Sequence, residues 1–174
     1  IEDLIGRQVL MFPIANHAES ASSVLQIVQP NFIVLSGGQD TTRRHATEIA
    51  IIKYSLKNSL PMLGVCHGMQ IINEYFGGSS IEVEGHVKKT HQVYSANTSA
   101  YSQFSVNSFH NFGIREDGLG KGLEPLWRDI DNHIESYKSR DHNILGIMWH
   151  PERYSHIKEK SQEWLSKYLR EWIY

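Results

Sequence analysis

One short run of the sequence constrains the fold more than any other, because it surrounds the only cysteine, Cys66. Gly64 and Gly68 lie two residues to either side of Cys66, with apolar strand-like residues before them and an amphipathic stretch after them. Gly-x-Cys-x-Gly between a strand and a helix predicts a nucleophile elbow, since the glycines let the backbone turn sharply and leave the thiol exposed. The positive end of the helix is expected to favour the thiolate. A chain with such an elbow is expected to be an enzyme with a covalent mechanism.

Composition and charge argue against several classes of protein. The chain has 174 residues and a formal net charge of −2, with no basic or acidic block, so we expect no nucleic-acid partner and no membrane contact. No apolar run approaches the roughly 18 residues needed to cross a bilayer, and the acidic start of the chain does not resemble a signal peptide. A single cysteine cannot form an internal disulfide, so we expect a cytoplasmic location, where the thiol stays reduced.

The first half of the chain alternates between strand and helix patterns. Short apolar runs predict strands at residues 8–14, 31–35 and 62–65. Apolar residues at helical spacing predict helices at residues 20–28, 47–57 and from the elbow to about residue 76. In the second of these helices Glu48, Lys53 and Lys57 keep one side polar, and the polar residues 39–44 before it predict a loop. This alternation is typical of a doubly wound α/β fold, with a mostly parallel sheet and helices on both faces.

The second half of the chain has a different pattern. Short apolar runs joined by polar turns predict strands at residues 88–94, 103–106, 122–127, 134–138 and 144–148. We therefore expect a short antiparallel region beside the parallel sheet. Residues 155–174 predict a final helix with a buried stripe of Ile157, Trp164, Leu165, Tyr168 and Leu169. The length fits one domain over residues 1–174, and the lack of a central strand before residue 8 leaves open whether natural N-terminal residues are missing.

A cysteine nucleophile needs a base that takes its proton and a third group that orients the base. The segment Ile144 to Glu152 supplies both, because an apolar strand leads into His150, Pro151 and Glu152. Pro151 biases His150 toward an extended conformation, in which residues two positions apart point to the same side. The spacing therefore predicts that Glu152 orients His150 and that Cys66, His150 and Glu152 form a catalytic triad.

An acyl-transfer site also needs an oxyanion hole, in which backbone N–H groups face the oxygen of the tetrahedral intermediate. His67, the residue after the cysteine, is expected to supply one of these groups. Gly38 is expected to supply the other, because the turn Ser36-Gly37-Gly38 follows a predicted strand and glycines present their amides unobstructed.

These motifs resemble the class I (triad) glutamine amidotransferase superfamily. The matching segments occur in the family's order and at similar intervals, at Leu35–Asp40, Pro61–Gln70, Val106–His110 and Met148–Glu152. Within the superfamily the chain is similar to the γ-glutamyl hydrolase-like branch, of which Val106–His110 and Gly85–His91 are typical. The resemblance covers most of the chain from about residue 30.

The resemblance implies a mechanism and a set of substrate contacts. Cys66 is expected to attack the γ-carbonyl of a glutamyl group, so that an amine or ammonia leaves, a γ-glutamyl thioester forms, and water releases glutamate. Gln70, Ser108 and Phe109 are expected to help hold the glutamyl moiety, and no cofactor is expected. The side chain of His67 stands where relatives often carry Arg or Leu, and we expect it to face the acceptor end of the substrate.

Two functions stay open at this point. The first is a stand-alone hydrolase of a preformed γ-glutamyl conjugate, since no second domain that consumes ammonia fits within 174 residues. Some bacterial members of the branch hydrolyse γ-glutamyl-CDP-amidate and release cytidine diphosphoramidate for capsule polysaccharide modification, and the chain resembles them. The alternative is a glutaminase subunit that supplies ammonia to a separate synthetase. The oligomeric state is left open.

Two further groups of residues are candidates for ligand contacts. A nucleotide diphosphate leaving group needs cations, and Arg43, Arg44, Lys88 and Lys89 are candidates for that role, although they also fit a solvated surface. Ten histidines are many for a chain of this length and could include metal ligands, but His86 and His91 are five residues apart with no cysteine or carboxylate pair nearby. That is a weak pattern, so no metal site is expected. His110 is expected to be a structural hydrogen-bonding residue.

Overall fold

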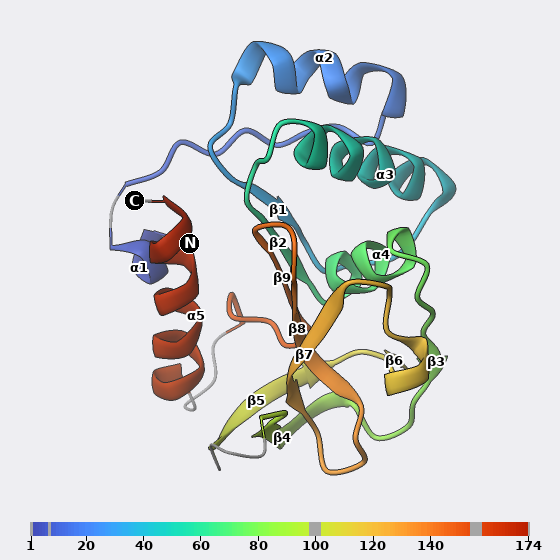
Figure 1. Ribbon diagram of the computed structural model, residues 1–174, viewed down its shortest axis with the longest axis vertical. Coiled ribbons are helices and arrows are strands. Elements are labelled where there is room, and N and C mark those ends of the chain that lie inside the picture. The colour runs from blue at the N-terminus through green and yellow to red at the C-terminus, as the bar shows by residue number, and fades with distance from the viewer. Residues whose placement is uncertain (1, 7, 98–101, 154–157, 174) are drawn as a thin grey trace.

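The computed structural model describes residues 2–6, 8–97, 102–153 and 158–173 of the chain (Figure 1). Its helices are α1 (Glu2–Ile5), α2 (Ala18–Val28), α3 (Thr42–Lys57), α4 (His67–Tyr75), the 3-10 helix η1 (Glu116–Gly118) and α5 (Lys158–Ile173). Its strands are β1 (Ile33–Leu35), β2 (Met62–Val65), β3 (Ile81–Glu82), β4 (Val87–Ser95), β5 (Gln103–Phe109), β6 (Phe112–Gly113), β7 (Leu123–Arg128), β8 (Ile134–Ser139) and β9 (Ile144–Ile147).

The main sheet joins both halves of the chain. Its seven strands lie in the order β1-β2-β9-β8-β7-β4-β5, and β3 pairs with β6 in a separate small sheet. The pairs β1-β2 and β2-β9 are parallel, while β9-β8, β8-β7, β7-β4 and β4-β5 are antiparallel. The predicted α/β fold with an antiparallel region in its second half is confirmed. The antiparallel region is larger than the sequence pattern indicates, because short turns join the later strands and favour antiparallel neighbours.

Helices cover both faces of the parallel part of the sheet (Figure 1). Side chains alternate in direction along a strand, so Met62 of β2 packs with α2, α3 and α4, whereas its neighbour Leu63 packs on the α5 side. In β9, Ile144 and Leu145 divide between the two sides in the same way. All four side chains are buried, which explains why both strands are uninterrupted apolar runs in the sequence.

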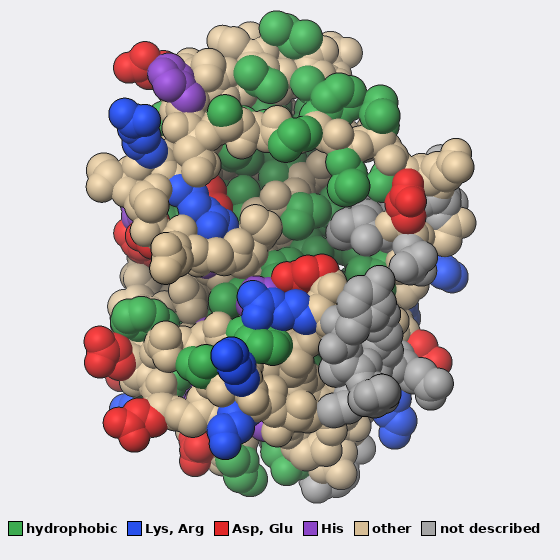
Figure 2. Space-filling model, turned by 180° about the vertical axis from the view of Figure 1, so that it is seen from behind, with side chains coloured by type: hydrophobic (Ala, Val, Ile, Leu, Met, Phe, Trp, Pro, Cys, Tyr) green, Lys and Arg blue, Asp and Glu red, His purple; other side chains and the backbone are tan. Residues whose placement is uncertain are grey.

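Residues 8–14 do not form the predicted strand. The segment lies outside both sheets, and its large side chains Leu10, Met11 and Phe12 are exposed. Figure 2 shows hydrophobic side chains on the upper part of the molecule's back face, the side on which this segment passes in Figure 1. Pro13 lacks the N–H that a ladder uses, and an apolar run forms a strand only where a neighbouring strand can pair with it.

The second predicted helix begins earlier than expected. α3 starts at Thr42, so part of the predicted loop at residues 39–44 is helical. Thr41 caps this helix, because its hydroxyl accepts a hydrogen bond from the N–H of Arg44 at 3.2 Å.

The final helix is confirmed as α5. Leu165 and Leu169 are buried, and Trp164 and Tyr168 pack against the same core as partly buried residues, while the predicted contact Ile157 lies outside the described residues. None of the described helices is long and apolar enough to cross a membrane.

Candidate active site

Cys66 lies at the turn between β2 and α4 in a conformation that few non-glycine residues adopt, with φ 51° and ψ −106°. Such backbone strain is typical of a nucleophile elbow. The N–H of Cys66 donates to the carbonyl of Ile147 in β9 at 2.8 Å, which attaches the turn to the sheet. The strand, turn and helix predicted around the cysteine are therefore present.

Glycines on either side of Cys66 allow the close contacts of this turn. A Cβ at Gly68 would lie 2.1 Å from the carbonyl oxygen of Leu35, and a Cβ at Gly64 would lie 2.6 Å from the carbonyl oxygen of Gly68. Because only glycine fits at both positions, α4 packs directly against the ends of β1 and β2.

His150 and Glu152 form an ion pair just after β9. Nδ1 of His150 lies 2.6 Å from Oε1 of Glu152, in agreement with the spacing across Pro151. The imidazole is buried, whereas the side chain of Glu152 is 58% exposed. Since the carboxylate accepts the Nδ1 hydrogen, Nε2 is the atom left for proton transfer. Within the described part of the chain, Nε2 is buried and has no hydrogen-bond partner.

The surroundings of His150 set its protonation. Burial lowers the pKa of the imidazole, but the interaction with the neighbouring Cys66 and the hydrogen bond and charge of Glu152 outweigh burial and raise the pKa to about 9. Burial raises the pKa of Glu152, but its hydrogen bond with His150 outweighs that effect and holds the pKa below its ordinary value. The imidazolium form of His150 therefore dominates at neutral pH. A thiol, an imidazole and a carboxylate in this order can act as the nucleophile, the base and the group that orients the base.

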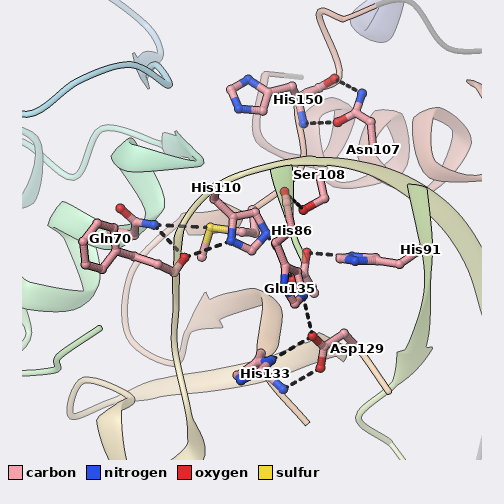
Figure 3. A network of polar contacts seen from close by, with 12 residues as sticks. Gln70, His86, His91, Asn107, Ser108, His110, Asp129, His133, Glu135 and His150 are labelled. Atoms are coloured by element: carbon pink, nitrogen blue, oxygen red, sulfur yellow. Dashed lines mark hydrogen bonds and ion pairs between the residues drawn. The ribbon is translucent and has the colours of Figure 1, made fainter. Parts of the chain in front are cut away.

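Asn107 of β5 holds the backbone of His150 (Figure 3). Its Oδ1 accepts from the N–H of His150 at 2.8 Å, and its Nδ2 donates to the carbonyl of His150 at 2.8 Å. The motif Val106–His110 contains Asn107. The sequence does not reveal the contact between Asn107 and His150, since these two residues are 43 positions apart.

Phe109 and Gly37 lie against the ring of His150, and Arg153 lies over the ring of Phe109. The ring of Phe109 contacts it edge-to-face, with centroids 5.7 Å apart. A Cβ at Gly37 would lie 2.4 Å from Cε1 of the imidazole, so only glycine leaves room for the ring. Cζ of Arg153 lies 4.0 Å from the ring centroid of Phe109, which places a cation at the site that the sequence does not single out.

The loop after β1 carries the first predicted oxyanion-hole residue. Gly38 has φ 138°, which favours glycine, and a Cβ there would lie 2.5 Å from Nη1 of Arg44. Arg44 donates to three carbonyls of this loop, those of Ser36, Gly37 and Gln39, at 2.5, 3.4 and 3.3 Å. The guanidinium of Arg44 therefore shapes the loop, and the expectation that it contacts a leaving group is not supported.

The side chain of His67 is bonded to Glu48 of α3. Nε2 of His67 lies 2.9 Å from Oε2 of Glu48, and Oε1 of Glu48 accepts from Nε of Arg44 at 2.9 Å. With 10% of its side chain exposed, His67 is directed to Glu48 of α3, and its contact with the acceptor end of the substrate stays a prediction. Glu48 connects the two segments whose N–H groups, at Gly38 and His67, are predicted to form the oxyanion hole.

The predicted substrate residues Gln70 and Ser108 have different surroundings. Nε2 of Gln70 in α4 donates to the carbonyl of Phe112 at 3.0 Å, and the residue is partly buried. Ser108 is fully buried, and its hydroxyl donates to the carbonyl of His86 at 2.6 Å. Ser108 therefore points to the opposite side of β5 from Asn107. The substrate roles of Gln70 and Ser108 stay predictions.

The other cationic candidates lie on the surface. Arg43 is exposed on α3, and Lys88 and Lys89 are exposed in β4, at a bulge opposite the end of β5. A contact between these side chains and an anionic leaving group stays a prediction.

An α/β fold with a cysteine elbow beside a histidine–glutamate pair is typical of triad-type amidohydrolases. The family model described as glutamine amidotransferase class-I matches residues 4–171 of the chain. The chain belongs to this family and is an amidohydrolase enzyme, which confirms the family that its motifs resemble.

Individual relatives share much of the chain. It is 36% identical to the γ-glutamyl-CDP-amidate hydrolase of Campylobacter jejuni over 145 residues, which cover 77% of this chain and 69% of the relative. It is 26% identical to anthranilate synthase component 2 of Pseudomonas aeruginosa, with 91% of this chain and 82% of the relative covered. The solved structure of a glutamine amidotransferase from Thermotoga maritima shares the fold with a TM-score of 0.66 at 15% identity, covering 95% of this chain and 80% of the other.

Proposed function

We propose that the chain hydrolyses a γ-glutamyl amide through a γ-glutamyl thioester on Cys66. The observation that carries this proposal is the 2.6 Å contact between His150 and Glu152 beside the strained elbow of Cys66. Cys66 is the proposed nucleophile, His150 the base and acid, and Glu152 the group that orients His150.

The proposed reaction has two halves. With the proton of the Cys66 thiol already held by His150, Sγ attacks the γ-carbonyl carbon as the thiolate, and the resulting oxyanion accepts hydrogen bonds from the N–H groups of Gly38 and His67. The intermediate expels the amine, which takes the proton from His150, and the thioester remains. In the second half His150 takes a proton from water, the resulting hydroxide attacks the thioester, and His150 returns the proton to the departing sulfur. Glutamate is then released and the thiol is restored.

The proposed substrate is a preformed γ-glutamyl conjugate. Similarity to an enzyme named for γ-glutamyl-CDP-amidate supports this compound, from which cytidine diphosphoramidate would leave for capsule polysaccharide modification. Arg153 beside Phe109, with the exposed Lys88 and Lys89, supplies the cations that a diphosphate needs. The proposed location is the cytoplasm, because a nucleophilic thiol needs a reducing compartment.

The glutamyl end of the substrate is proposed to contact Gln70, Ser108 and Phe109. Phe109 has the strongest support, since its ring lies against the imidazole of His150. Gln70 lies one turn after Cys66 in α4, where its side chain starts from the same end of the helix as the thiol.

The alternative is a glutaminase subunit that passes ammonia to a separate synthetase. Similarity to anthranilate synthase component 2 favours this function, because that relative is named as one component of a synthase.

Substrate preference distinguishes the two functions. Purified protein is offered glutamine, γ-glutamyl-CDP-amidate and other γ-glutamyl amines, and glutamate release is measured. Fast cleavage of a conjugate by the protein alone, with slow turnover of glutamine, supports the hydrolase. Glutamine turnover that appears only with an added synthetase supports the subunit and contradicts the hydrolase.

Two variants test the roles of the triad. Cys66→Ala is expected to lower kcat by about 10⁶-fold while the fold stays intact, and Glu152→Gln to lower it by less, roughly 10⁴-fold. Glu74→Gln removes an exposed acid on α4 and serves as the control. Undiminished turnover by Cys66→Ala would remove the covalent mechanism.

A further inference from the structure

Six polar side chains that the proposed reaction does not use gather behind β5, on the opposite side from Asn107 (Figure 3). They come from the start of β4, the end of β5 and the β7–β8 hairpin, and they are His86, His91, His110, Asp129, His133 and Glu135. We call these six residues the histidine cluster. His91 is partly exposed, and the other members are at most 8% exposed.

Backbone carbonyls fix the tautomers of two rings in the histidine cluster. Nδ1 of His86 lies 2.9 Å from the carbonyl oxygen of Glu84, and Nδ1 of His110 lies 2.9 Å from the carbonyl oxygen of Phe112. A carbonyl only accepts, so each Nδ1 carries a hydrogen, and a neutral ring then has its lone pair on Nε2. This arrangement, in which one ring nitrogen donates to a carbonyl and the other is left as a base, is typical of histidines that bind metals.

These Nε2 atoms face carboxylate oxygens. Nε2 of His86 lies 2.9 Å from Oδ2 of Asp129, and Nε2 of His110 lies 3.5 Å from Oε1 of Glu135. A lone pair that faces a carboxylate is repelled, so each contact requires a proton or a metal cation to join the two atoms.

Buried atoms without partners favour the cation. Within the described residues, Nε2 of His91, Nε2 of His110 and both carboxylate oxygens of Glu135 are buried and make no hydrogen bond. The carboxylate of Glu135 lies 3.4 Å from His91 and 3.5 Å from His110, beyond the usual hydrogen-bond range of about 2.7–3.2 Å. Ligand atoms at about 2.0–2.2 Å from a tetrahedral ion lie roughly 3.3–3.5 Å from one another. The 3.4 Å between His91 and Glu135 therefore matches two neighbouring ligands of one ion.

We propose that the histidine cluster binds one divalent transition-metal ion, for which zinc is the best fit. The proposed ligands are His86, His91 and Glu135, whose ligand atoms lie within 4.8 Å of one another. His110 and Asp129 flank this group and complete the surroundings of the ion. Imidazole and carboxylate donors suit Zn²⁺ and, unlike thiolates, do not select softer metals.

The position of the cluster gives the ion a structural role. The bound ion would join β4 to β8 and to the segment that follows β5. The hydroxyl of Ser108 bonds to the carbonyl of His86 at 2.6 Å, and the carbonyl of Phe112 accepts from both His110 at 2.9 Å and Gln70 at 3.0 Å. The cluster thereby braces β5 and α4 from behind, so that stability is expected to depend on the ion more than chemistry does.

Metal binding by the full chain, purified without a histidine tag, tests the proposal. Metal content is measured by mass spectrometry, and protein stripped with EDTA is titrated with Zn²⁺ and with Co²⁺, whose visible spectrum reports tetrahedral coordination. We expect one equivalent to bind, and the thermal midpoint to rise by roughly 5–10 °C when Zn²⁺ is about 100 times Kd. A protein that carries no metal as purified and shows neither a Co²⁺ spectrum nor a thermal shift would overturn the proposal.

Matched variants locate the ligands. Glu135→Gln keeps the shape of the side chain but removes its charge, and His91→Gln alters the partly exposed ligand, so each is expected to weaken Zn²⁺ binding by at least 10-fold. His142→Asn changes an exposed histidine outside the cluster and should bind Zn²⁺ as the parent does. If Glu135→Gln does not fold, His91→Gln decides, because unchanged affinity in that variant contradicts the proposed ligand set. These measurements do not use catalytic activity, so their outcome is independent of the proposed reaction.

Discussion

The side-chain amide of Asn107 holds both backbone polar groups of His150, accepting from its N–H and donating to its carbonyl, each at 2.8 Å. Glu152 meanwhile holds the imidazole through Nδ1 at 2.6 Å. Two residues thus fix the proposed base. Glu152 holds its ring, whereas Asn107 acts only through its backbone.

Asn107→Ala removes both of these backbone hydrogen bonds. We expect kcat to fall by roughly 10- to 100-fold with little change in KM, because the imidazole shifts from the position in which it meets the thiol. The free energy of unfolding should fall by about 1–3 kcal/mol, since buried groups lose their partner. Steady-state kinetics and chemical denaturation measure the two effects. The control is Asn58→Ala, which removes an exposed side-chain amide that donates to the carbonyl of Tyr54. An unchanged kcat in Asn107→Ala would show that Asn107 does not position His150.

Protonation of His150 makes the stability of the fold depend on pH. Burial lowers its pKa, but Cys66 and Glu152 outweigh burial and raise the pKa from 6.5 to about 9. Because the folded state binds the proton more tightly than the unfolded state, this stabilisation is complete below pH 6.5 and is lost as the pH rises through about 9.

Glu152→Gln removes one of the two groups that raise the pKa of His150. The loss of stability on the alkaline side should therefore become smaller in this variant, and the NMR titration of the His150 ring should move to lower pH. Thermal midpoints of both proteins across this pH range provide the comparison. Identical pH profiles for parent and variant would contradict the coupling between the two residues.

Two glycines near the elbow are expected to fail in different ways when they are changed to alanine. A Cβ at Gly37 meets Cε1 of His150 at 2.4 Å, whereas a Cβ at Gly68 meets the carbonyl oxygen of Leu35 at 2.1 Å. Gly37→Ala should therefore displace a side chain and lower kcat by about 100-fold with a small change in thermal midpoint. Gly68→Ala should push α4 off β1 and cost about 1–3 kcal/mol of stability. A loss of stability in Gly37→Ala together with a loss of kcat alone in Gly68→Ala would contradict these two roles.

The residues of the proposed triad could be found from the sequence because each carries a local signal. Glycines mark the turn at Cys66, and Pro151 sets the spacing between His150 and Glu152. Their meeting follows from topology, since β2 and β9 are adjacent parallel strands and their carboxyl ends lie at the same edge of the sheet.

Other contacts could not be found from periodicity alone. Glu48 falls on the side of its predicted helix that the pattern assigns to solvent, yet it is only 5% exposed, because Arg44 and His67 pair with it. The histidine cluster forms only when β4, β5, β7 and β8 come together in one sheet, which the spacing of His86 and His91 does not reveal. Residues 8–14 illustrate the same limit, since an apolar run favours burial without specifying a strand neighbour.

Glu48 offers the sharpest test of the proposed oxyanion hole, since it bonds to the side chain of His67 and, through Arg44, is linked to the loop that carries Gly38. Glu48→Gln keeps the shape of the side chain but removes the charge that faces Arg44 and His67, each at 2.9 Å. We expect kcat to fall by roughly 10- to 100-fold as the N–H groups of Gly38 and His67 lose their alignment, and the free energy of unfolding to fall by about 3 kcal/mol. Steady-state kinetics and chemical denaturation measure the two effects. Glu74→Gln, which changes an exposed acid, is the control.

The pH dependence of kcat separates this effect of Glu48 from an effect on the base. His150 has its own supports in Asn107 and Glu152, so Glu48→Gln should lower kcat at every pH and leave the apparent pKa of the base where it is. A shifted pH profile would place the effect at His150 instead. If the folded variant keeps the kcat of the parent, Glu48 has no role in catalysis. The alignment of the two N–H groups would then not depend on the charge of Glu48.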